Sequence, residues 1–97
     1  MDPQIWKWTL ELTDEQVVMM PVGAEILSVG VQHEELRVWA KVDPGEVLGP
    51  RQFFMYGTGH PMETELPQRF IGTVQMQGGC LVLHVYERLD THASEDE

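Results

Sequence analysis

The stretch that decides the fold is residues 24–42, AEILSVGVQHEELRVWAKV, which contains two runs of alternating apolar residues. From Leu36 to Val42 every second residue is apolar, and the residues between them include Arg37 and Lys41. A period of two is typical of a half-buried strand, whose side chains point alternately to its two faces. A short polar turn separates the two runs, so the stretch predicts a β-hairpin.

The first run of this hairpin places Leu27, Val29 and Val31 on one face. The small residues Ser28 and Gly30 fall on the other face, and they predict either close packing or a β-bulge. Working outward, the same alternation predicts further strands at residues 5–12, 17–20, 52–56, 69–77 and 80–87.

Turn residues stand between these strands. Gly78-Gly79 joins the last two strands as a second hairpin, because glycine tolerates the positive φ that primed turns need. Six to seven short strands joined by Gly and Pro turns, with no substantial helix, predict an all-β protein. The architecture expected is a small antiparallel β-sandwich or a partly open barrel.

A length of 97 residues fits a single domain. We expect residues 1–87 to form one β domain and residues 88–97, which are acidic and lack an apolar period, to form a disordered tail. The single cysteine, Cys80, excludes an internal disulfide. Its apolar neighbours predict a buried, inert thiol.

The charge restricts the class of partner. The chain has 16 acidic and 6 basic residues, a formal net charge of −10, so we expect no direct binding to nucleic acid. The acidity has two interpretations, solubility or an acidic face that meets a basic partner. The N-terminus is polar and no apolar stretch approaches the length of a membrane span, so we expect no signal peptide and a soluble cytoplasmic protein.

The most unusual local sequence is Gly57-Thr58-Gly59-His60. Backbone N–H groups between two glycines can form a concave nest for an anion, to which His60 adds a hydrogen bond. The lysine and the following helix of known phosphate loops are missing, so a sharp turn without a ligand is the alternative. The pattern of histidines, serines and carboxylates predicts no metal site, no cofactor and no enzyme.

Aromatic residues are more numerous than the inner face of one sheet can bury. Alternation places Trp39 on the face of its charged neighbours, and it places Phe54 and Tyr56 opposite Phe53. These rings, with Arg51 and Arg69 nearby in the sequence, are candidates for contacting a partner or a nucleobase. Burial in two packed sheets and self-association as a homo-oligomer are the alternatives.

Several short motifs recur together in a known family. They are Ile5-Trp6-Lys7, Met20-Pro21, Gly23-Ala24, Ile26-Leu27-Ser28-Val29, Trp39-Ala40, Val42-Asp43-Pro44, Gly57-Thr58-Gly59-His60, Phe70-Ile71-Gly72-Thr73 and Leu83-His84-Val85. With them the chain resembles, over about residues 4–87, a family of short, uncharacterised proteins encoded by bacteriophages and prophages. The resemblance implies a phage accessory protein in the cytoplasm of a bacterial host, and it transfers no catalytic or binding residue.

The leading hypothesis is therefore an accessory binding protein, encoded by a phage, that modulates or inhibits a bacterial host factor such as an antiviral defence component. A second hypothesis is a protein that sequesters a nucleotide or another small ligand, using the Gly57–His60 turn, the nearby aromatics and Arg51 or Arg69, in a site within one chain or between subunits. A third is a virion or assembly component, for which a small β-sandwich is a suitable building block.

Overall fold

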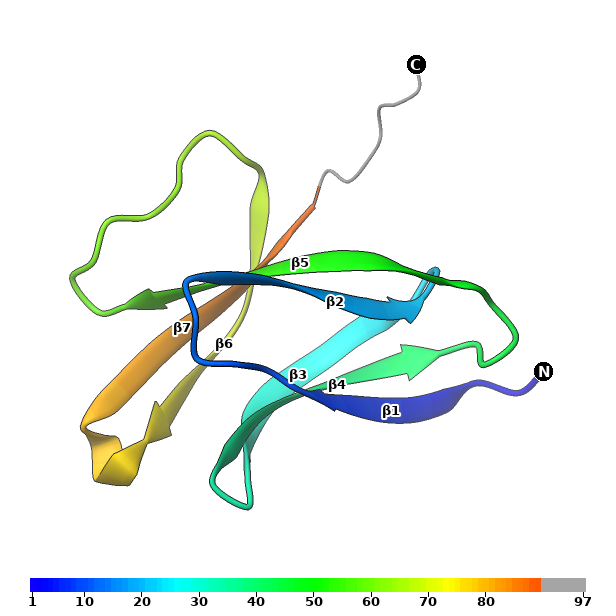
Figure 1. Ribbon diagram of the computed structural model, residues 1–97, viewed down its shortest axis with the longest axis horizontal. Coiled ribbons are helices and arrows are strands. Elements are labelled where there is room, and N and C mark those ends of the chain that lie inside the picture. Colours follow the sequence, from blue (N-terminus) through cyan, green and yellow to red (C-terminus); the bar gives the residue numbers. More distant parts are fainter. Residues whose placement is uncertain (90–97) are drawn as a thin grey trace.

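A computed structural model describes residues 1–89 as two antiparallel sheets (Figure 1). The three-stranded sheet has the order β1 (Gln4–Thr9), β4 (Glu35–Val42), β3 (Glu25–Gln32). The four-stranded sheet has the order β2 (Glu15–Pro21), β5 (Leu48–Gly57), β7 (Leu81–Arg88), β6 (Gln68–Met76). The described residues contain no α-helix, only a short 3-10 turn at Gln77–Gly79. The prediction of an all-β sandwich with six to seven strands is confirmed.

The hairpin of β3 and β4 closes as tightly as its sequence predicts. Gln32 pairs with Glu35, so the loop contains only His33 and Glu34. Both loop residues have positive φ, 54° and 66°, the backbone of a primed turn that favours glycine or asparagine. The backbone of His33 and Glu34 is therefore left-handed, although neither residue is a glycine or an asparagine.

A β-bulge between Ile26 and Ser28 changes which side chains of β3 point toward the core. Val29 packs against the core as expected, but Leu27 is exposed and Ile26 is buried in its place. The expectation that Leu27 shares the inner face is wrong, because the extra residue of the bulge shifts the alternation by one position.

The two sheets approach closely where β3 lies against β6. A Cβ atom on Gly72 would lie 3.0 Å from Cγ2 of Val29, so the absence of a side chain at this position permits the contact. The core lies between the sheets, and its fully buried side chains include Leu36, Val38 and Phe53. Trp6 and Trp8 are half-buried and pack against this core, as their alternation in β1 predicts.

Strand β5 is longer than expected and begins within the turn-rich segment, so that Pro50 pairs with Met19. Proline fits there because β7 pairs with β5 only from Phe53 onward, and no ladder bond is required on that side. Cys80 is exposed, not buried as predicted, because it lies in the turn and β7 begins at Leu81.

The end of β7 differs by one residue from the expected boundary between the β domain and the tail. β7 extends through Arg88, so the β domain is slightly longer than residues 1–87. The rest of the predicted tail, from residue 90, lies outside the described residues. No helix within residues 1–89 is long and apolar enough to cross a membrane.

Candidate functional site

The structure distributes the predicted site residues over four places. Phe54 and Tyr56 lie on the outer face of the four-stranded sheet, and the Gly57–His60 turn follows at the end of the same strand. Arg51 and Arg69 lie on the inner face of that sheet, and Trp39 lies on the outer face of the other sheet. Within a single chain these residues therefore do not lie in one place.

Four aromatic rings form a continuous cluster on the outer face of the four-stranded sheet. Phe54 stacks on Tyr56 with their ring centroids 6.3 Å apart, and Tyr56 meets Tyr86 edge to face at 5.6 Å. Phe70 contacts Tyr86 at 5.3 Å. The strand register explains the cluster, because Phe54 and Phe70 both pair directly with Tyr86 across neighbouring strands. We call these four residues the aromatic face.

The aromatic face is covered at one side and open at the other. Hydrogen bonds of Tyr56 hold the segment between β5 and β6 beside this ring. The Tyr56 hydroxyl group donates to Oε1 of Gln68 at 2.9 Å and accepts from the backbone N–H of Glu63 at 3.3 Å. Phe54 is buried although it lies outside the main core. Phe70, on the edge strand β6, remains 53% exposed.

The Gly57–His60 turn is closed by a hydrogen bond of 3.0 Å from the N–H of His60 to the carbonyl oxygen of Gly57. A Cβ atom on Gly57 would lie 2.8 Å from Nδ1 of His60, because the imidazole folds back over this glycine. Gly59 has a φ of 88°, which glycine adopts without strain. Gly57 is therefore favoured because a larger residue would contact the imidazole, and Gly59 is favoured because of its backbone conformation.

His84 joins this turn to the aromatic face. It pairs with Tyr56 in the sheet, and its ring lies between two hydroxyl groups, with Nε2 2.8 Å from Oγ1 of Thr58 and Nδ1 2.9 Å from Oγ1 of Thr73. A threonine hydroxyl can donate or accept, so the neutral imidazole has partners in either tautomer. Three predicted residues, Phe54, Tyr56 and Thr58, thus lie in one neighbourhood.

The sequence prediction did not select Phe70, Tyr86, His84 or Thr73 as site residues. The available signal was the alternation in the last strand, which places His84 and Tyr86 on one face. Their neighbours on β6 required the strand order, because β6 has its own bulge between Phe70 and Gly72 that alters its alternation.

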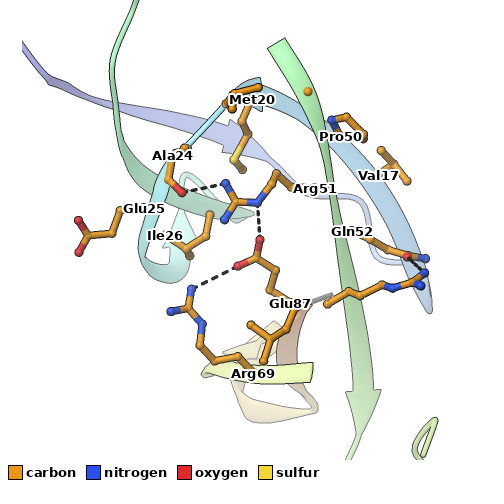
Figure 2. A pocket seen from close by; sticks show the side chains of 15 residues that line it. Val17, Met20, Ala24, Glu25, Ile26, Pro50, Arg51, Gln52, Arg69 and Glu87 are labelled. Atoms are coloured by element: carbon orange, nitrogen blue, oxygen red, sulfur yellow. Dashed lines mark hydrogen bonds and ion pairs between the residues drawn. The ribbon is translucent and has the colours of Figure 1, made fainter. Parts of the chain in front are cut away.

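The inner face of the same sheet carries an ion-pair cluster (Figure 2). The Glu87 carboxylate accepts from Nε of Arg51 at 2.5 Å and from Nη2 of Arg69 at 3.2 Å. Arg51 also donates from Nη1 to the carbonyl oxygen of Ala24 at 2.8 Å, which links the four-stranded sheet to the start of β3. Arg51 and Arg69, which the sequence offered only as alternatives, thus both contact a buried glutamate that the sequence did not indicate.

Trp39 is half-buried on the outer face of the three-stranded sheet and pairs with Lys7 of β1. A Cβ atom on Gly30 would lie 3.5 Å from Cζ3 of Trp39, so the indole lies beside Gly30 of β3. Arg37, two residues along β4, donates to Oγ1 of Thr9 and forms an ion pair of 3.0 Å with Glu35. Trp39 is far from the aromatic face in the fold, since the two lie on different sheets.

Within the described part of the chain, no group of three or more His, Cys, Asp and Glu side chains is placed to hold a metal ion. The polar groups that converge are hydroxyl, imidazole and amide groups beside aromatic rings, which can form hydrogen bonds and stacking contacts with a bound molecule.

Fold and geometry together define a small all-β domain of two antiparallel sheets, with an aromatic cluster on its outer surface. The chain belongs to the family described as a domain of unknown function (DUF7352), whose model matches residues 1–96. No curated protein and no solved structure matches the chain.

Proposed function

We propose that this domain is a binding protein without catalytic activity, and that the aromatic face is the surface through which it holds a bacterial host protein. The observation that carries the proposal is the cluster of four contacting rings outside the core, which ends in the exposed Phe70. Tyr, Phe and Trp are enriched at protein interfaces, where large rings exclude water and their polar ends form hydrogen bonds. The resemblance to phage proteins supports a host protein as the partner.

The polar border of the aromatic face supports the same proposal. The exposed Thr58 and Thr73 hydroxyl groups lie next to the rings, and each is bonded once to His84 and retains further hydrogen-bonding capacity, so hydrophobic burial and hydrogen bonding are available on one surface. A partner that covers Phe70 would add apolar burial worth about 25 cal/mol per Å². The net charge of −10 further favours a partner with basic residues around its contact surface.

The test is capture of host proteins from a bacterial lysate by three matched baits. Wild type and Ile5→Glu should capture the same discrete protein, whereas Phe70→Glu should lose it. Ile5 is the control because it is also an exposed apolar strand residue, 63% accessible, but lies on the outer face of the other sheet. Equal capture by all three baits, or none by wild type, would contradict the proposal.

A second candidate function, binding of a nucleotide, is favoured by one observation. The hydrogen-bonding groups of His84 and Thr58 lie beside stackable rings, and a nucleobase needs both kinds of contact. Thermal-shift measurements with nucleotides separate this function from protein binding, because a ligand at about 100 times its Kd adds roughly 2.7 kcal/mol to stability. The shift should disappear in His84→Ala, and no shift with any nucleotide would exclude this candidate.

A further inference from the structure

The cluster of Arg51, Glu87 and Arg69 lies on the face of the sheet opposite the aromatic face, and all three residues line a cavity. Figure 2 shows the three side chains pointing toward one another, with Met20, Ala24 and Ile26 beside them and Val17, Pro50 and Gln52 on the other side of β5. Alternate residues of β5 point to opposite faces, so the cavity has one part on each side of this strand. We call the part on the side of Arg51 the compartment.

The charges in this compartment do not balance. Two guanidinium groups face one carboxylate, and that carboxylate, with its side chain only 4% exposed, contacts both of them. Glu25 also lines the cavity, but its Oε1 atom forms an ion pair of 3.4 Å with Nζ of Lys41. The cluster therefore has an excess of one positive charge in a chain whose net charge is −10.

Hydrogen-bond donors remain available on the accessible arginine. A guanidinium has five N–H donors, and the bonds within the cluster use one donor of Arg69, from Nη2 to Oε1 of Glu87. The Arg69 side chain is 48% exposed, so its other donors can reach a molecule that enters the cavity. Arg51 is held more firmly, by Glu87 and by the carbonyl oxygen of Ala24.

We propose that the Arg51–Glu87–Arg69 cluster is a binding site for a small monocarboxylate with an apolar body. One negative charge neutralises the excess, and a planar carboxylate matches the fork of a guanidinium in a bidentate arrangement. Val22 and Leu89 also line the cavity, and because each is about half exposed they offer apolar surface to the hydrocarbon part of such a molecule. A phosphate would bring up to two negative charges and no apolar surface, so it fits the compartment less well.

The test is a titration of the full chain with hexanoate, followed by amide chemical shifts in NMR spectra. Hexanoate should produce saturable shifts for backbone amides around Arg69, whereas hexanol, a neutral molecule with the same number of carbon atoms, should not. Inorganic phosphate should bind at least tenfold more weakly than hexanoate. Absence of saturation, equal binding of hexanol, or tighter binding of phosphate would overturn the proposal.

Variants distinguish specific binding at Arg69 from a general attraction of the anion to any arginine. Arg69→Gln should raise the Kd for hexanoate at least tenfold, whereas Arg37→Gln should leave it within twofold. Arg37 is the matched control because it also forms an ion pair with a glutamate, Glu35, but lies on the other sheet and does not line the cavity. If Arg69→Gln does not fold, Arg69→Lys keeps the charge without the fork and should raise the Kd several-fold. An unchanged Kd in the folded Arg69 variant would refute the site.

This site does not depend on the function proposed for the aromatic face. Phe70→Glu should leave the Kd for hexanoate unchanged while it abolishes partner capture, so the failure of either proposal is visible without the other.

Discussion

Replacing Glu87 by glutamine tests how much the buried ion-pair cluster contributes to folding. The change keeps the shape of the side chain and removes the negative charge, which leaves the Arg51 guanidinium, only 23% exposed, without an ionic partner. Breaking a fully buried pair by removing one member costs about 3–5 kcal/mol. Because Arg69 is half exposed and water screens part of the charge, we expect a loss of about 2–3 kcal/mol here.

The assay is urea unfolding followed by the fluorescence of Trp6 and Trp8, which pack against the core. With a urea m-value of about 1.5 kcal/mol per molar, the midpoint should fall by about 1.3–2 M at an unchanged slope. Glu25→Gln is the control, because the Glu25–Lys41 pair is exposed and should contribute less than about 1 kcal/mol.

A double-mutant cycle tests whether the loss of stability comes from the ion pair between Arg51 and Glu87. Arg51→Gln combined with Glu87→Gln should be less destabilised than the sum of the two single changes, with a coupling energy above about 1 kcal/mol, since neither charge is then left unpaired. A loss below about 0.5 kcal/mol for Glu87→Gln, or additivity in the cycle, would refute the reasoning that the carboxylate stabilises the arginine.

Three further predictions follow from particular contacts. Gly72→Ala should destabilise the fold by about 1–2 kcal/mol, because its Cβ would press on Val29, whereas Gly30→Ala, at 3.5 Å from the Trp39 ring, should have a smaller effect in the same urea assay. His33→Asn combined with Glu34→Gly should stabilise by about 1 kcal/mol and raise the Tm by roughly 4–8 °C, because both positions have positive φ; an unchanged Tm in calorimetry would contradict the turn geometry. Cys80 should react with a maleimide reagent in the folded protein as readily as in urea, and protection in the native state, measured by mass spectrometry, would show that the thiol is covered.

The candidate site illustrates how far a sequence prediction extends. Alternation alone placed Phe54 and Tyr56 on the face opposite Phe53, because a strand has only two faces. It did not indicate that Tyr86 and Phe70 lie beside them, since this depends on β7 pairing with both β5 and β6. It also grouped the arginines with the Gly57–His60 turn, although Arg51 and that turn lie toward opposite ends of β5 and the arginines point to the inner face.

The all-β class, both hairpins and the positions of most strands were determined by the sequence itself, because the period of the apolar residues and the turn residues act locally along the chain. The tertiary structure alone decided which strands are neighbours, and hence the aromatic face and the pairing of Glu87 with two arginines. It also decided the bulge that exposes Leu27 and buries Ile26. The physical reason is that strand order and bulges are selected by packing between segments distant in the sequence, which no local pattern encodes.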